Sequence, residues 1–197
     1  MQTTMHPEDP SDPNPLQFPL VRGRATPAPP LKRGGREGFE LHKLPVLEYL
    51  QRHVGGTLTD AHITHMRYPT AISRTLDIRI VEVGRGCATV EIDADPALHG
   101  NQQGTVHGGL ICELADAAIG TAHSTLMAEG ESFTSLELKI NFFRPVWRSK
   151  LRAHAKPVQS GRTITCYTCE ITREDGKVAA MVVSTVMTLS GEKAAGR

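Results

Sequence analysis

The sequence predicts an α+β domain in which an antiparallel sheet packs against one long helix. Three observations favour this class. Apolar and polar residues alternate over two runs within residues 75–92, as in a strand followed by a returning strand. One long helical pattern covers 106–127, and four strand-like runs lie between 133 and 189. The predicted order is β-β-α-β-β-β-β, with no internal repeat, which is typical of an α+β domain.

Residues 74–189 hold these patterns, and two different segments precede them. Eight of the 13 prolines fall within residues 1–40, so we expect that segment to be a flexible extension. Residues 41–73 are predicted to be a helical N-terminal segment, with a helix over 44–54 that buries Leu44, Leu47 and Leu50 and ends at two glycines. Its remainder, 57–72, is predicted as loop, with one more helical turn as an alternative.

The first strand pair occupies 75–83 and 87–92. Leu76, Ile78 and Ile80 alternate with polar residues, as a half-buried strand requires. Val81 and Val83 then shift the phase, which indicates either a bulge or a more deeply buried strand end. Residues 84–86 form the turn. Polar residues with glycine and proline predict a loop over 93–105.

The helix predicted at 106–127 has an alanine-rich apolar face that suits close packing. That face comprises Leu110, Leu114, Ala117, Ala118, Thr121, Ala122 and Leu126. Strands are predicted at 133–143, 151–159, 162–173 and 177–189, joined by short glycine-containing turns. Residues 190–197 are expected to fray.

Charge and cysteine content limit the function classes. The formal net charge of +1 gives no general attraction to nucleic acid, and a basic run over 22–36 is interpreted as a solvated tail. Cys166 and Cys169 have a CxxC spacing, but on a strand they face opposite sides, so we expect neither a metal site nor a disulfide. No signal peptide or membrane span is expected, and reduced thiols suit a cytoplasmic protein.

Residues 99–116 carry the clearest chemical signal. His107, Gly108 and Gly109 open the long helix, and Asp116 follows on the same rigid element. The first amides of a helix lack intrahelical acceptors and can hold an oxyanion, while a carboxylate can attack or activate water. The combination predicts hydrolysis at an acyl carbon. We expect burial of Asp116 to raise its pKa and its basicity.

Each of these residues also has a simpler interpretation. Asp116 would otherwise be a solvent-facing helical aspartate, and Glu113 is the alternative carboxylate. The glycines would be a flexible turn, although a glycine also lets a thioester carbonyl approach the backbone. His107 would cap the helix, orient the backbone or donate to substrate. His62 and His65 have an HxxH spacing without a third ligand, so no metal is expected.

Four segments together resemble the hotdog-fold thioesterases, in the PaaI-type branch of the 4-hydroxybenzoyl-CoA thioesterase superfamily. They are Asn101–Gly109, Leu114–Asp116, Ser135–Pro145 and Ser160–Arg162. The resemblance spans about residues 74–189. It implies a hotdog fold, with the sheet wrapped around the helix, and a homo-oligomer (a dimer, or a homotetramer built as a dimer of dimers) with active sites at the subunit interface.

The resemblance also assigns roles. It implies that Asp116 is the catalytic carboxylate, that the Gly108 amide is the oxyanion donor in the other subunit, and that His107 and Asn101 assist. It places Ser135 as a substrate-binding hydroxyl, with Gly109 and Thr134 as neighbours. Arg144 and Arg162 are weaker candidates for the phosphates of coenzyme A, because a solvated surface has the same composition.

The sequence therefore predicts an acyl-CoA thioesterase that hydrolyses an aryl or medium-chain thioester to the free acid and coenzyme A. Asp116 would be nucleophile or general base, and no cofactor beyond the substrate's coenzyme A would be needed. The alternative is a non-catalytic acyl-CoA-binding or regulatory protein on the same scaffold. Neither nucleic acid nor a membrane is expected as a partner.

Overall fold

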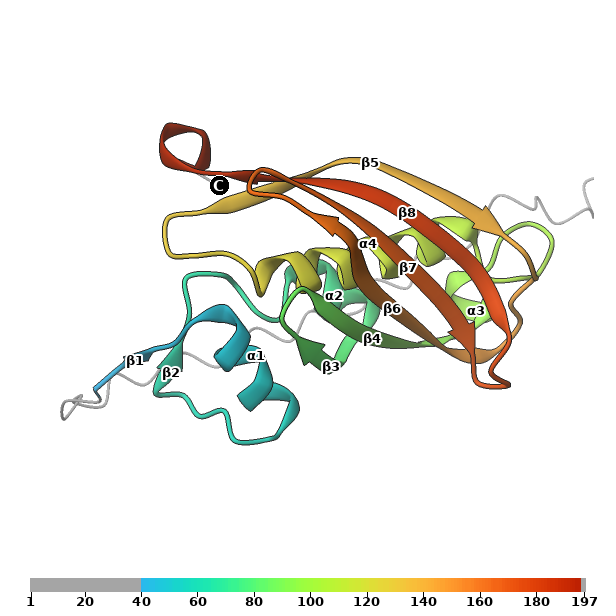
Figure 1. The fold of residues 1–197 in the computed structure, drawn as a ribbon. Coiled ribbons are helices and arrows are strands. Elements are labelled where there is room, and N and C mark those ends of the chain that lie inside the picture. Colours follow the sequence, from blue (N-terminus) through green and yellow to red (C-terminus); the bar gives the residue numbers. More distant parts are fainter. Residues whose placement is uncertain (1–39, 196–197) are drawn as a thin grey trace, which may run out of the picture. The chain divides into compact units, whose positions relative to one another are not determined.

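The computed structural model describes residues 40–195, so the proline-rich extension predicted at 1–40 lies outside the described residues apart from its last position. Six strands form one antiparallel sheet in the order β3-β4-β6-β7-β8-β5. Their bounds are Arg79–Gly84 (β3), Cys87–Ala94 (β4), Ser132–Phe142 (β5), Ser149–Ser160 (β6), Ile164–Arg173 (β7) and Val178–Leu189 (β8). The sheet curves over one long helix, α4 (Gly108–Ser124), as predicted (Figure 1).

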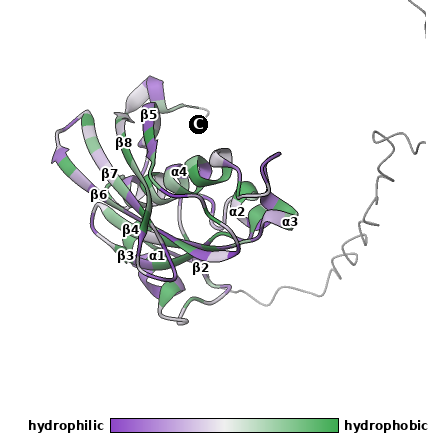
Figure 2. Cartoon of the chain, turned by 90° about the vertical axis from the view of Figure 1, so that its right-hand side faces the viewer, coloured by the Kyte–Doolittle hydropathy of each residue, from purple (hydrophilic) through white to green (hydrophobic). Residues whose placement is uncertain are grey.

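The core lies between α4 and the concave face of the sheet. Leu114, Ala115, Ala118, Ile119 and Ala122 of the helix are all completely buried. They meet a sheet face that is itself rich in alanine, at positions 88, 153, 155, 179 and 180. Small side chains on both surfaces let the helix approach the strands closely, and apolar residues line both layers (Figure 2).

The buried face of α4 is wider than the predicted one. Ala117 and Leu126 are only half-buried, whereas Ile111, Ala115 and Ile119, which lie outside the predicted face, are buried. Because the curved sheet encloses the helix from more than one side, a single apolar stripe underestimates the contact. The helix is also shorter than predicted, since it begins at Gly108 and ends at Ser124.

The first predicted strand begins too early. Residues Ala71–Leu76 form a helix (α2), and the strand starts only at Arg79. Thr70 caps α2 by accepting a hydrogen bond from the Ser73 amide, and Asp77 ends it in the left-handed conformation. The capped turn therefore overrides the alternation at Leu76. The predicted bulge is confirmed, because the pairing of β3 with β4 shifts between Ile80 and Glu82.

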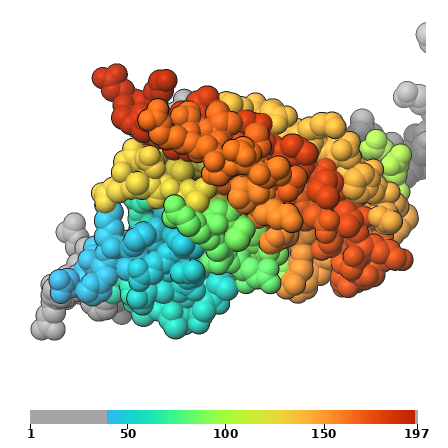
Figure 3. All heavy atoms as spheres, in the orientation of Figure 1, coloured from blue at the N-terminus to red at the C-terminus, as the bar shows by residue number. Residues whose placement is uncertain are grey.

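The N-terminal segment contains short elements that pack as one layer. A helix, α1 (Val46–Val54), buries Val46 and Leu50, whereas Leu44 precedes the helix and Leu47 is half-buried. Two short parallel strands, β1 (His42–Lys43) and β2 (His62–Ile63), join its flanks. Figure 3 shows this segment, in blue to cyan, lying against the rest of the chain.

Two further short elements differ from the prediction. The loop at 93–105 contains a helix, α3 (Pro96–His99), which Asp95 caps by accepting from the Ala97 amide. The expected frayed tail contains a 3-10 turn, η1 (Gly191–Ala194), while residues 196–197 lie outside the described part. Cys166 is half-buried and Cys169 buried on alternate positions of β7, so they face opposite sides of the strand as predicted.

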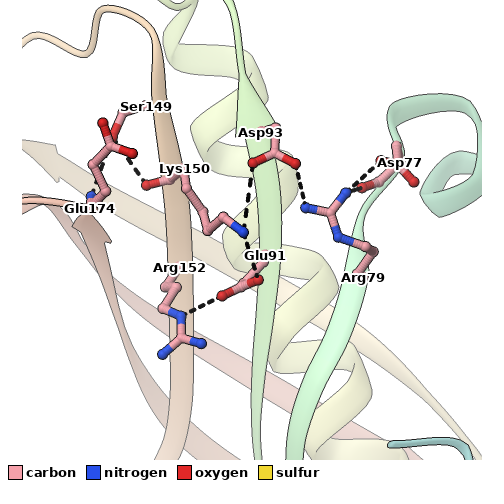
Figure 4. Close-up of polar contacts among 8 residues, drawn as sticks. All are labelled: Asp77, Arg79, Glu91, Asp93, Ser149, Lys150, Arg152 and Glu174. Atoms are coloured by element: carbon pink, nitrogen blue, oxygen red, sulfur yellow. Dashed lines mark hydrogen bonds and ion pairs between the residues drawn. The ribbon is translucent and has the colours of Figure 1, made fainter. Parts of the chain in front are cut away.

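Charged residues cover the outer face of the sheet at β3, β4 and β6 (Figure 4). Arg79 bridges Asp77 and Asp93, and Arg152 and Lys150 both pair with Glu91. Glu91 is only 6% exposed, and these two cations compensate the burial of its carboxylate. The network ties three neighbouring strands together on the side opposite α4.

His123, near the C-terminal end of α4, is a buried histidine of the core. Its Nδ1 lies 3.1 Å from the Tyr167 hydroxyl and its Nε2 lies 3.0 Å from Thr188 Oγ1. Burial lowers the pKa of His123 to about 4, so the ring is neutral at pH 7.

This burial predicts acid sensitivity. An unfolded histidine binds a proton near pH 6.5, while folded His123 binds one only near pH 4, so the unfolded state takes up more protons between these values. The contribution of neutral His123 to the free energy of unfolding should therefore be greatest above pH 6.5, and it should decrease as the pH falls toward 4. Urea titrations at several pH values would measure this.

The His123→Gln variant keeps hydrogen-bonding capacity but does not titrate, so its stability should fall less over the same window. The exposed His53→Gln serves as the matched control and should follow the wild type. An identical loss in the wild type and His123→Gln would contradict the assignment.

Candidate active site

The start of α4 is held by its own histidine. His107 is the N-cap, and its Nδ1 accepts a hydrogen bond of 2.8 Å from the Gly109 amide. The His107 amide in turn donates to the His99 carbonyl at 2.7 Å. These contacts support the backbone-orienting role among the interpretations of His107. The Gly109 amide is therefore occupied, whereas the Gly108 amide has no acceptor among residues 40–195.

Both glycines sit where a side chain would collide. A Cβ at Gly109 would lie 2.9 Å from His107 Nδ1, and a Cβ at Gly108 would lie 3.0 Å from Cζ of Phe142. A side chain at Gly109 would displace the capping ring, and one at Gly108 would make a tight contact with the exposed ring of Phe142 at the end of β5. This packing is a second reason for glycine at these two positions, beside the close approach of a substrate carbonyl.

Asn101 organises the loop before the helix. Its Oδ1 accepts from the amides of Gln103 (2.9 Å) and Thr105 (3.2 Å), and its Nδ2 donates to Thr105 Oγ1 (2.9 Å). This is the pattern of an asparagine that shapes a turn. All of these side-chain bonds are local, so the loop interpretation accounts for the residue, and its assisting role in catalysis stays a prediction.

Asp116 and Ser135 are brought together from α4 and β5. Ser135 Oγ donates to Asp116 Oδ1 at 3.1 Å. A bulge in β5, where the pairing with β8 shifts between Ser135 and Glu137, lies directly beside this contact. Thr134, the neighbouring candidate, contacts only the Ser135 carbonyl, at 3.5 Å. The hydroxyl fixes one carboxylate oxygen and leaves the other available.

The expectation that Asp116 is buried is wrong for the single chain. Asp116 is exposed, because the sheet covers the opposite side of α4. Glu113, one turn earlier, is half-buried, and both its burial and the nearby Asp116 carboxylate raise the pKa of Glu113. The two carboxylates share a shallow groove between α4 and β5, which Gly109, Cys112 and Leu136–Leu138 also line.

The Gly108 amide and Asp116 cannot act on one carbonyl within one chain. They are eight residues apart on a continuous helix, which places them about 12 Å apart along its axis. A carbonyl oxygen held by the amide would thus be out of reach of the carboxylate. A site that uses both groups on one carbonyl therefore needs a second copy of the chain.

A larger cavity, missed by the sequence analysis, begins at Asp116. We name this cavity of about 1060 Å³ the α2–α4 pocket; it lies between the N-terminal segment and the outer face of α4. Its walls include Tyr68, Ile72, Ile78, Ala117, Gly120 and Phe133, and Glu113 and Asp116 lie at its edge. The available signal was the pair of small residues Ala117 and Gly120, which lie four residues after Glu113 and Asp116 respectively, one helical turn further along α4.

The arginine candidates do not meet in one chain. Arg144 follows β5 and its Nη1 donates to the Val178 carbonyl at 2.6 Å, where β8 begins. Arg162 lies in the turn before β7, whose first residue pairs with Met187 near the end of β8. The two side chains therefore sit at opposite ends of the sheet and cannot bind the same phosphate group within a protomer.

Between residues 40 and 195, His, Cys, Asp and Glu side chains nowhere gather in threes at a spacing that would hold a metal ion. Over the same range, every helix is too short or too polar to cross a membrane.

A curved antiparallel sheet around one central helix, with an open amide at the helix start and a carboxylate at its middle, defines the hotdog class of thioester hydrolases. Comparison with known proteins agrees. The family model described as "Thioesterase superfamily" matches residues 103–180. The chain belongs to this superfamily and is a thioester hydrolase by class.

Individual relatives are similar over the same region. A protein of Saccharolobus solfataricus named "Putative esterase" is 30% identical over 112 residues, 57% of this chain and 79% of the relative. One of the same name from Deinococcus radiodurans is 35% identical over 123 residues, 60% of this chain and 81% of the relative. The structure of the E. coli PaaI protein from the phenylacetic acid degradation operon matches with a TM-score of 0.58 and 26% identity, over 62% of this chain and 87% of that one.

The capping contact of His107 yields a stability prediction. Removing a helix N-cap costs about 1 kcal/mol, so His107→Ala should lower the free energy of unfolding by about that amount. Asparagine is a good N-cap, so His107→Asn should recover most of the loss. Chemical denaturation of the three proteins measures the difference, and equal stabilities of the alanine and asparagine variants would contradict the capping role.

Proposed function

We propose that the protein is an acyl-CoA thioesterase that hydrolyses an aryl or medium-chain acyl thioester, with an active site shared between two copies of the chain. The observation that carries the proposal is the division of the catalytic groups along α4. The Gly108 amide, without an acceptor in the described residues, and the Asp116 carboxylate, fixed by Ser135, lie about 12 Å apart on one rigid helix.

A two-fold arrangement of two antiparallel α4 helices resolves this separation. If the axis passes beside Cys112, midway between residues 108 and 116, each Asp116 faces the Gly108 amide of the second copy. The strand β5 supports such pairing, because it is one of the two edge strands of the sheet, packs beside α4 and has one edge without a partner among the described residues. We infer a dimer as the smallest active unit.

Hydrolysis then follows from ordinary acyl-transfer chemistry. The thioester oxygen accepts a hydrogen bond from the Gly108 amide at the positive end of the helix, which stabilises the tetrahedral oxyanion. Asp116 either attacks the carbonyl carbon, forming an anhydride that water opens, or takes a proton from an attacking water. The carbon–sulfur bond breaks, and the free acid and the coenzyme A thiol leave. None of these steps calls on a cofactor.

A non-catalytic acyl-CoA-binding protein is the second candidate, because the same groups would also hold a thioester. The exposed carboxylate favours the enzyme: binding a neutral carbonyl needs the amide but gains nothing from a nearby negative charge. Release of free thiol from acyl-CoA distinguishes the two, since a binding protein would give none.

The Asp116→Asn variant tests the catalytic carboxylate. The amide neither attacks nor accepts a proton at neutral pH, so kcat should fall at least about 100-fold. The dissociation constant of a non-hydrolysable acyl-CoA thioether should stay within a few-fold of the wild-type value, because shape and hydrogen bonding are preserved. Thiol release and calorimetry measure the two quantities.

Glu113→Gln is the matched control on the same helix face. A large loss of kcat in Asp116→Asn and a small one in Glu113→Gln assigns the reaction to Asp116. The reverse pattern would transfer the role to Glu113, and near-normal turnover of Asp116→Asn would refute the proposed mechanism.

The two-fold arrangement makes a separate prediction for Cys112. If the axis passes beside this residue, the two Cys112 thiols lie within reach of a short bifunctional maleimide. Partial burial raises the pKa of Cys112 and so lowers its thiolate fraction, and the crosslinking should therefore be followed as a time course. Most of the protein should migrate as a covalent dimer on a denaturing gel.

The Cys112→Ser variant should abolish this crosslink, whereas Cys166→Ser, on the half-buried thiol of β7, should leave it intact. A dimer in solution that does not crosslink through Cys112 would place the two-fold axis elsewhere and separate the two half-sites.

A further inference from the structure

The α2–α4 pocket is a cavity to which the proposed reaction has so far given no role. We propose that it binds the acyl group of the substrate, and that the chain's own segment 65–80 sets which acyl lengths are accepted. This inference rests on the proposed function. The inference goes beyond the proposed function because it assigns a role to a wall built by the N-terminal segment. Residues 65–80 of this wall precede the region that the family model matches.

The pocket begins at the catalytic carboxylate. Asp116, Ala117, Gly120 and Thr121 lie on one stripe of α4 and all line the cavity. Gly120 is one turn beyond Asp116, about 6 Å along the helix. An acyl group whose carbonyl sits beside Asp116 can therefore extend along α4 past two small residues.

The opposite wall contributes several apolar side chains and is firmly attached. Ile72 of α2 and Ile78 face the same cavity as Phe133 of β5. The Tyr68 hydroxyl donates to Ser124 Oγ at the end of α4, and burial raises the pKa of Tyr68 to about 12, so this anchor stays protonated. Its attachment fixes the spacing between segment 65–80 and the helix.

Most charged side chains in the lining are already paired, although Arg67 and Glu113 have no hydrogen-bond or ion-pair partner among residues 40–195. Arg74 donates to the Pro69 carbonyl at 2.7 Å, and Arg79 bridges Asp77 and Asp93. Glu131 accepts from the Ala128 amide at 2.9 Å. The surface left for a ligand is therefore mainly apolar, which suits a hydrocarbon chain better than a charged or strongly polar acyl group.

Gly120 is the position where the pocket can be narrowed without disturbing the core. A Cβ at this residue would lie 3.8 Å from Phe133, an ordinary contact, so the fold does not require glycine here. Glycine in the middle of a helix is otherwise unfavourable, and alanine would stabilise it. The absence of a side chain at residue 120 is thus explained by the space that it leaves for a ligand.

The test compares hydrolysis of acetyl-, butanoyl- and octanoyl-CoA by the full chain. Each buried methylene contributes roughly fourfold in affinity, so blocking two of them changes binding about 15-fold. Gly120→Leu should lower the octanoyl-to-acetyl ratio of kcat/KM by about tenfold or more, and Gly120→Ala should lower it less while raising the melting temperature. Ile72→Ala, in the N-terminal wall, should lower the ratio several-fold.

Ile164→Ala removes an isoleucine of similar exposure on β7, away from the pocket, and should keep the wild-type ratio. Unchanged ratios in the Gly120 and Ile72 variants of an active enzyme would overturn the pocket assignment. A changed oligomeric state on gel filtration with an unchanged ratio would overturn it too, because a second copy would then fill the cavity.

A binding measurement with thioethers distinguishes failure of this inference from failure of the proposed function. S-octyl-CoA, a thioether that cannot be hydrolysed, should bind the wild type more tightly than S-methyl-CoA, and Gly120→Leu should remove about tenfold of that advantage. If the wild type shows this binding pattern but releases no thiol from acyl-CoA, the pocket assignment is supported and the proposed hydrolase activity is refuted. If the two thioethers bind wild type equally, the pocket assignment is overturned whatever the activity.

Discussion

Close packing of α4 into the curved sheet is the constraint on which the rest of the molecule depends. Alanines on the inner face of the helix, Ala115, Ala118 and Ala122, meet alanines of β4 and β6, so backbones approach without intervening bulk. A larger side chain at any of these positions would push the helix outward. That shift would move the Gly108 amide and the Asp116 carboxylate together, because both belong to the same rigid element.

The outer face of α4 is free of this constraint and carries the groups to which we assign the proposed reaction. Asp116 is exposed and Glu113, Ala117 and Gly120 are half-buried, and none of them belongs to the fully buried core. Substitutions on the outer face should therefore change activity more than stability, whereas those on the inner face should do the opposite. One helix can therefore both pack in the core and present the groups of the proposed site.

Periodicity predicts the order of strands and helix along the chain and the irregularity at Val81. A sheet that buries one face leaves a pattern of period two in the sequence, and the long helix leaves its own apolar pattern. Helix α2 could not be predicted, since its cap at Thr70 is a local contact that competes with an apolar alternation. The exposure of Asp116 was also missed. Its alanine neighbours reflect the sheet on the other side of the helix, and periodicity alone does not reveal how far a sheet wraps.

The α2–α4 pocket lay beyond sequence reasoning for a related reason. Its walls come from Tyr68, Ile72, Gly120 and Phe133, which no short motif connects, and only the packing of the N-terminal segment brings them together. Motifs mark groups that must act on a conserved chemical step, such as an amide and a carboxylate. A pocket for an apolar group needs only space and apolar surface, so many combinations of residues can form one. Which residues form it in this chain is seen only in the folded structure.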